Sequence, residues 1–171
     1  MSLILNGDTG ISAVDGTASA PALVGVDTDT GVYFSAANTL DFATAGTRRA
    51  SINSTGDLQF NSGYGSVATA YGCRAWVNFD GTTNTGGFCT IRGSGNVTSV
   101  ADGGVGVYTI NFTNAMPDVN YSASLVGRRA TANGGQYTLT TLSTTSLLIY
   151  TAGNTGTAAL DYDNVCVAIF R

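Results

Sequence analysis

The sequence has 171 residues, of which 43% are hydrophobic and 11% are charged, and its formal net charge is −4. Histidine, lysine and glutamate are all missing, so arginine carries every positive charge and aspartate every negative one. This composition excludes a disordered chain, because enough apolar side chains are present to build a core. It predicts an all-β protein, since the abundant Gly, Thr, Asn and Asp are poor helix formers.

The same composition excludes most functions that need a charged or catalytic site. Binding to nucleic acid requires a basic patch, whereas the seven arginines are scattered along an acidic chain. Without His, Lys or Glu, the chain cannot build a Ser-His-Asp triad, a Cys-His pair or a Schiff-base lysine. Glycoside hydrolysis by two aspartates is possible in principle, but most aspartates lie in turn contexts, where they bond their own backbone. We therefore expect no enzymatic activity and no cofactor.

The first segment, residues 1–20, begins with a short apolar run, Leu3, Ile4 and Leu5. It has no basic n-region and no h-region of about 7–15 residues, so it does not resemble a signal peptide. No stretch of the chain approaches the roughly 18 apolar residues of a membrane span. We expect a protein that is made and folded in the cytoplasm, without membrane insertion.

Residues 21–65 contain short β-prone runs that Gly, Asp and Thr separate. Large side chains are few, and an isolated segment of this kind buries little surface in water. It can be ordered if copies of the chain wrap around a common axis and share their apolar residues. The segment therefore predicts an extended β shaft, intertwined in a homotrimer. The predicted strands are residues 22–26, 31–34, 39–44, 48–52 and 57–60.

From residue 66 to residue 171 the apolar runs lengthen, alternate and are separated by turn signals. Regular short strands of this kind predict a compact antiparallel β-sandwich, a jelly-roll-like knob. The alternation is clearest where Tyr108, Ile110 and Phe112 should share one face. The eight predicted strands are residues 73–79, 88–92, 96–101, 107–113, 120–127, 136–142, 146–152 and 164–170.

Cysteine and tryptophan in these predicted strands favour a structural interpretation. Cys73, Cys89 and Cys166 cannot all pair within one chain, and no CxxC motif is present. We expect small buried hydrophobic residues rather than a disulfide, in keeping with a reducing cytoplasm. Trp76 is predicted to lie in the core, and the alternative is a platform on which a sugar ring stacks.

Two pairs of aspartates could lend oxygen atoms to a calcium ion, namely Asp27 with Asp29 and Asp161 with Asp163. Neither pair has the bidentate glutamate of a strong calcium loop, so we expect no metal. Arg48 and Arg49 are expected to bridge to aspartates of neighbouring chains. For Arg128 and Arg129 the same bridging is favoured, and contact with an anionic host glycan is the alternative.

Residues 27–60, "DTDTGVYFSAANTLDFATAGTRRASINSTGDLQF", resemble a recurrent segment of bacteriophage tail fibres and tailspikes. The upstream stretch "GDTGISAVDGTASAPALVGV" also resembles phage fibre sequence, especially that of phages of aquatic bacteria. Downstream, "CRAWVNFDGT", "IRGSGNVTSVADGGVGVYTINFTNAMPDVNYSAS" and the ending "VCVAIFR" resemble the C-terminal module of such fibres. The residues that carry the first likeness are Asp29, Thr30, Gly31, Tyr33, Leu40, Phe42, Gly46, Arg49, Ile52 and Gly56.

This resemblance implies a homotrimeric fibre on the exterior of a virion. Residues 1–20 would dock on another virion protein, with Leu3, Ile4 and Leu5 as apolar anchors. The knob would adsorb to a host surface receptor, a glycan or a protein, through the loops Gly81–Gly87, Ala130–Gln136 and Gly153–Thr157. Within and beside these loops, the candidate receptor-binding residues are Thr83, Asn84, Arg128, Arg129, Asn133, Gln136, Tyr137 and Asn154.

Two other functions fit the same sequence. One is a capsid decoration or head-fibre protein that binds no specific receptor. The other is a monomeric carbohydrate-binding module with a disordered N-terminal tail. The monomeric module predicts protease sensitivity before about Gly65, whereas a trimeric shaft predicts resistance.

Overall fold

The computed structural model describes residues 14–61, 63, 65–129, 135–153 and 158–171, together with the backbone of residues 4–6 and 10–12. Every regular element among these residues is a strand, and every paired strand runs antiparallel to its neighbour, which confirms the all-β prediction. None of the described residues forms a helix that could cross a bilayer.

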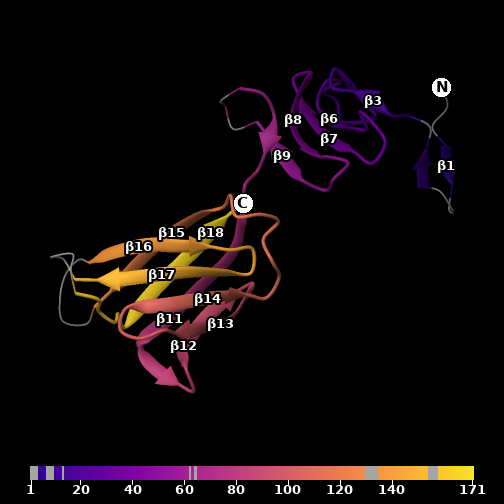
Figure 1. Cartoon of the computed structure of the whole chain (residues 1–171). Coiled ribbons are helices and arrows are strands. Elements are labelled where there is room, and N and C mark those ends of the chain that lie inside the picture. Colours follow the sequence, from indigo (N-terminus) through magenta and orange to yellow (C-terminus); the bar gives the residue numbers. More distant parts are fainter. Residues whose placement is uncertain are drawn as a thin grey trace. The chain divides into compact units, whose positions relative to one another are not determined.

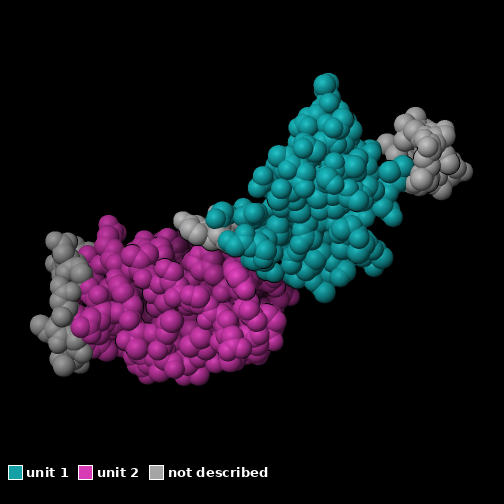
Figure 2. All heavy atoms as spheres, turned by 90° about the horizontal axis from the view of Figure 1, so that it is seen from above, with its two compact units in different colours: residues 1–70 teal, residues 71–171 magenta. Residues whose placement is uncertain are grey.

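The chain divides into two compact units, residues 1–70 and residues 71–171 (Figure 2). The division that the sequence predicts, between residues 65 and 66, lies slightly earlier. The N-terminal unit begins with two short hairpins, β1 (Ile4–Asn6) with β2 (Gly10–Ser12) and β3 (Gly16–Thr17) with β4 (Ala20–Pro21). The predicted anchors Ile4 and Leu5 belong to β1, of which only the backbone is described, and Leu3 lies outside the described residues.

Six further strands of the N-terminal unit form a meander in which each strand pairs with the next along the chain (Figure 1). At the β7–β8 turn, Ala45 and Gly46 both have positive φ, as a tight hairpin of this twist requires. The short runs predicted as strands are therefore strands, and they pair within one chain. The strands are β5 (Leu23–Val24), β6 (Gly31–Tyr33), β7 (Leu40–Thr44), β8 (Thr47–Ile52), β9 (Leu58–Phe60) and β10 (Ala68–Thr69).

The two faces of this meander differ sharply in chemistry. The register places apolar residues opposite one another across all six strands on one side, which we name the apolar face. Most of its large side chains are exposed, including Phe42, Leu58 and Phe60. The apolar face consists of Leu23, Val32, Leu40, Phe42, Ala50, Ile52, Leu58, Phe60 and Ala68.

The opposite side of the meander, which we name the covered face, holds the buried residues of the unit. Tyr33, Asp41 and Ser51 are at most 5% exposed there. Pro21 lies against this side at Gly31, where an added Cβ would come within 3.0 Å of the Pro21 Cβ. The usual arrangement is thus partly inverted, because this face buries the polar Asp41 and Ser51 beside Tyr33 and Ala43, while the apolar face stays uncovered within one chain.

Asp41 is the centre of the covered face. Its carboxylate accepts hydrogen bonds from the Ser35 hydroxyl and, at 3.2 Å, from the Ser35 backbone N–H, and it lies 3.4 Å from an Arg48 nitrogen. Burial opposes ionisation, but the Ser35 bonds and the Arg48 charge outweigh it and hold the pKa of Asp41 below its ordinary value of 3.8. Arg48 therefore pairs with an aspartate of its own chain, and a bridge from Arg48 to a neighbouring chain stays a prediction.

We expect the stability of the N-terminal unit to fall at low pH because of Asp41. Its pKa is lower in the folded unit than in the unfolded chain, so its stabilising effect is complete above about pH 5 and is lost as the pH falls through 3.8 towards the folded value. Asp41→Asn should cost about 1–3 kcal/mol at neutral pH and flatten this dependence. Thermal melts of the two proteins between about pH 2 and pH 7 test this. Parallel pH profiles would contradict it.

The described part of the C-terminal unit contains eight strands, one for each strand that the sequence predicts. Their spatial order is β15-β18-β11-β12-β13-β14-β17-β16, which makes one antiparallel sheet rather than two separate ones (Figure 1). This sheet curls until its edge strands β15 and β16 contact each other. The strands are β11 (Cys73–Thr85), β12 (Phe88–Gly95), β13 (Val97–Asp102), β14 (Val107–Phe112), β15 (Ser122–Arg128), β16 (Gln136–Leu142), β17 (Ser146–Ala152) and β18 (Asn164–Phe170).

All eight strands contribute side chains to one core inside the curled sheet. Tyr108, Ile110 and Phe112 point into it together, as their alternation predicts. Aromatic rings meet edge to face, with the Phe79 and Tyr108 centroids 5.1 Å apart. This closed core explains why the unit is compact within a single chain. Its fully buried members include Phe79, Val100, Tyr108, Ile110, Leu147, Ile149 and Val165.

Three predictions about individual residues of this unit need correction. Trp76 is 46% exposed rather than buried, because Ala75 and Val77 on either side of it point into the core. All three cysteines are free, and Cys89 is buried as predicted, whereas Cys73 is exposed and Cys166 is partly exposed. Strand β11 continues through Thr85, so most of the predicted loop Gly81–Gly87 is strand.

Candidate functional site

The strand ends that flank the predicted receptor-binding loops lie at one end of the C-terminal unit. At the opposite end, the Arg171 N–H donates to the Gly72 carbonyl, so the first and last residues of the unit lie together. Strand β11 runs away from that end, and the antiparallel order then puts the β11–β12, β13–β14, β15–β16 and β17–β18 connections at the far end. We name this the distal end. The described residues of its connections are 86–87, 103–106, 129, 135, 153 and 158–163.

Tyr162 ties the connections of the distal end together. Its carbonyl accepts from the Gly81 N–H at 2.9 Å, and its hydroxyl donates to the Ala152 carbonyl at 2.7 Å. Its ring meets the Tyr137 ring edge to face, with centroids 5.6 Å apart. Tyr162 therefore connects segments that are far apart in the sequence, and it fixes the backbone positions of these segments at the distal end.

A second buried connection involves Asp161. Its Oδ1 accepts from the Gly106 N–H at 2.7 Å and from the Tyr108 hydroxyl at 2.8 Å. Burial and this carboxylate raise the pKa of Tyr108, which stays a hydrogen-bond donor. Asp163 pairs with Arg128 at 2.9 Å. The two aspartates that could have served a calcium ion therefore bind groups of the protein itself.

The other aspartate pair, Asp27 and Asp29, lies in the connection between β5 and β6. The Asp29 N–H approaches Asp27 Oδ1 at 3.4 Å, and the Asp27 side chain raises the pKa of Asp29. Among the described residues, no group of three or more Cys and acidic side chains is arranged to hold a metal ion.

The predicted residues of the β11–β12 hairpin are engaged in local hydrogen bonds. Thr83 Oγ1 donates to the Asp80 carbonyl and accepts from the Thr90 N–H, both at 2.8 Å. Asn84 donates to Asp102 at 2.7 Å and accepts from the Gly87 N–H at 3.0 Å. These bonds shape the hairpin, and Asn84 is nevertheless exposed at its tip.

The predicted residues around the β15–β16 connection differ in their exposure and in their hydrogen bonds. Arg128 is 73% exposed at its side chain in spite of its pairing with Asp163, whereas Arg129 is partly buried. Gln136 is exposed at the start of β16. The Tyr137 hydroxyl donates to the Gly127 carbonyl at 2.6 Å and accepts from the Gly127 N–H at 2.9 Å, which makes this residue structural. Asn133 and Asn154 lie outside the described residues.

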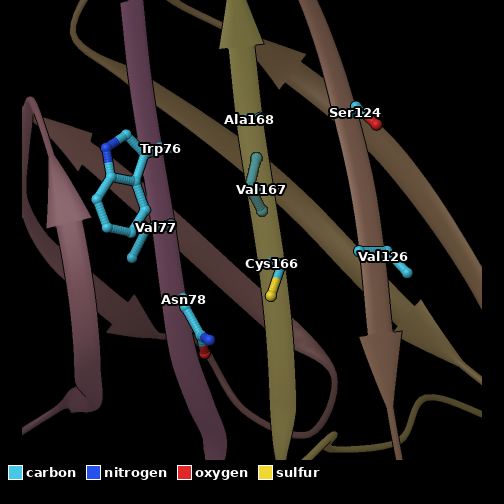
Figure 3. Close-up of a pocket in the computed structure, with 8 residues that line it drawn as sticks. All are labelled: Trp76, Val77, Asn78, Ser124, Val126, Cys166, Val167 and Ala168. Carbon is cyan, nitrogen blue, oxygen red and sulfur yellow. The ribbon is translucent and has the colours of Figure 1, made fainter. Parts of the chain in front are cut away.

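The structure also shows a hollow that the receptor-loop predictions did not include. It lies on the outer face of β11, β18 and β15 and has a volume of about 400 Å³ (Figure 3). The sequence did contain a signal for it, since Trp76 alternates with Arg74 and Asn78 on one face of its strand. The hollow is lined by Trp76, Val77, Asn78, Ser124, Val126, Cys166, Val167 and Ala168.

Comparisons of the chain with models of protein families, with curated proteins and with solved structures find no match.

Proposed function

We propose that the chain is a structural fibre protein of a bacteriophage virion, assembled as a homotrimer, and that its C-terminal unit adsorbs to a host surface receptor. The observation that carries the proposal is the apolar face of the meander. The register aligns apolar residues across six strands, and Phe42, Ile52, Leu58 and Phe60 are each at least 40% exposed. A contiguous exposed apolar surface of this kind marks an interface.

Further copies of the chain are the occupants that best suit this surface. Each copy carries the same apolar face, so three meanders that turn these faces inward enclose a shared core around a threefold axis. The polar covered face, with Asp41 and Arg48, then stays outside that core. This arrangement supplies the core that residues 21–65 cannot build alone, and it accounts for the resemblance of the same residues to fibre sequences.

Receptor binding is assigned to the distal end of the C-terminal unit. The frame of this end is fixed by Tyr162 and Asp161, while Asn84, Arg128 and Gln136 are exposed around it. Binding loops on a rigid scaffold commonly have this design. Three copies would also combine weak individual contacts into strong adsorption. Residues 1–20 would join the fibre to another virion protein.

The solution mass of the full-length protein, measured by light scattering during size-exclusion chromatography, tests this proposal. We expect three times the chain mass of 17.4 kDa, and we expect residues 21–65 to resist protease. A monomer that is cleaved before about Gly65 would overturn the fibre and favour a monomeric binding module. Antibody labelling of intact particles would then separate a tail fibre from a capsid decoration, because the two occupy different parts of the virion.

A further inference from the structure

The outer face of the curled sheet has a concave site beside Trp76, which we name the Trp76 hollow. The register sets Ala168 opposite both Trp76 and Ser124, and it sets Cys166 opposite both Asn78 and Val126. The small side chains of β18 therefore form a floor, and the residues of β11 and β15 form its two sides (Figure 3).

Glycines of β12 fix the position of the Trp76 indole. A Cβ added at Gly95 would come within 2.5 Å of Trp76 Nε1, and one added at Gly93 would lie 3.3 Å from Trp76 Cη2. The indole thus rests against a strip of bare backbone, and 46% of the residue stays accessible. The sequence provides a flat aromatic surface in a defined place on the outside of the unit.

Asn78 supplies a polar group beside this surface. Its side chain extends from β11 towards β18 (Figure 3). Its Oδ1 is inaccessible to solvent and accepts no hydrogen bond from the part of the chain that the structure describes. A buried acceptor without a donor costs free energy, so a turn of the Asn78 amide that brings Oδ1 to a ligand donor would gain affinity.

The chemistry of the lining defines the ligand. None of its residues is charged, so the hollow offers no partner for an ionic ligand. A pyranose ring has an apolar face that stacks on indole and hydroxyl groups at its edge that donate hydrogen bonds. The volume of about 400 Å³ lies in the range of small-molecule sites.

We propose that the Trp76 hollow binds a neutral saccharide ring, which stacks on Trp76 and donates a hydroxyl hydrogen bond to Asn78 Oδ1 once the Asn78 amide has turned towards the hollow. This site is separate from the distal end. It rests on the proposed function only for the source of the ligand, which would be the neutral glycan of a host surface.

Trp76 is the one tryptophan of the chain, so its fluorescence reports directly on the hollow. The full-length protein is titrated with the methyl glycosides of glucose, galactose, mannose and N-acetylglucosamine, and binding is confirmed by calorimetry. We expect at least one glycoside to shift the emission to shorter wavelength. Asn78→Ala should weaken that binding roughly tenfold, and Trp76→Ala should abolish the calorimetric signal.

Two control variants make the result specific. Tyr150→Ala removes another exposed aromatic residue of the same unit, outside the hollow, and should bind like the parent protein. Gly95→Val should displace the indole and abolish binding although Trp76 itself is retained. Melting curves of each variant confirm that the unit is folded.

Three outcomes would overturn the proposal: no glycoside shifts the emission, Trp76→Ala binds as well as the parent protein, or Trp76→Ala lowers the solution mass. The last result would identify the hollow as a contact between copies of the chain. The solution mass of the parent protein keeps the two proposals separate. A trimer that binds no glycoside refutes only the hollow, and a monomer that binds one refutes only the fibre.

Discussion

Replacement of both Phe42 and Phe60 by serine is expected to convert the assembled protein into monomers. The two residues lie in one row across the apolar face and are 40% and 46% exposed within a single chain. In the proposed trimer they would lose this exposure to the shared core. Burial of the remaining surface is worth about 1–2 kcal/mol for each side chain in each copy.

Six side chains are changed at once in a trimer, so the assembly loses about 6–12 kcal/mol in total. Each 1.4 kcal/mol is a factor of about ten in an equilibrium constant, and the variant should therefore dissociate at ordinary concentrations. Light scattering measures the change directly. Far-ultraviolet circular dichroism of the C-terminal unit should be unaffected, because the core of that unit is closed within one chain.

Val24→Ser is the matched control for this variant. Val24 is 47% exposed, nearly the same fraction as the 46% of Phe60. It pairs with Gly31, however, and so lies on the covered face. Its replacement should leave the mass unchanged. If Val24→Ser dissociates the protein as readily as the double variant, the assembly does not depend on the apolar face.

Gly106→Ala is expected to destabilise the C-terminal unit by about 2–5 kcal/mol. Gly106 has a φ of +68°, and an added Cβ would lie 2.4 Å from the Thr151 carbonyl oxygen and 2.8 Å from the Leu160 nitrogen. The left-handed conformation costs an alanine about 1–2 kcal/mol. Overpacking against the backbone adds about 1–3 kcal/mol. The Gly106 N–H that holds Asp161 would be displaced as well.

Gly86→Ala separates these two causes. Gly86 has nearly the same φ, +63°, but an added Cβ would meet nothing within 4 Å. It should cost only the conformational part, about 1–2 kcal/mol. Thermal melts should give a decrease of about 4–8 °C for each kcal/mol in a unit of this size. Equal decreases for the two variants would show that the contacts of Gly106 do not anchor the distal end.

The eight strands of the C-terminal unit were predictable because alternation and turn signals are local properties of the sequence. Their closure into one sheet was not, because the pairing of β11 with β18 joins residues far apart in the chain. For Trp76, hydrophobicity alone suggested the core. The phase of the strand, with Ala75, Val77 and Phe79 pointing inward, would have placed it outside.

The candidate sites show the same division between local and distant information. Loop residues such as Asn84 and Gln136 could be chosen from composition, whereas the engagement of Thr83 and Tyr137 depends on partners that only the fold defines. The Trp76 hollow needs three strands side by side, and β15 lies far from β11 in the sequence. The apolar face likewise becomes visible only when the register of the meander is known.

The outermost strands of the meander, β5 and β10, are only two residues long. Open-ended polymers of β proteins grow when a long free edge accepts the backbone of the next molecule. Here such an edge offers few backbone hydrogen bonds, whereas the proposed trimer would cover the apolar face with a fixed number of copies. Association of this protein should therefore stop at a discrete particle, and concentrated solutions should stay free of fibrillar aggregates.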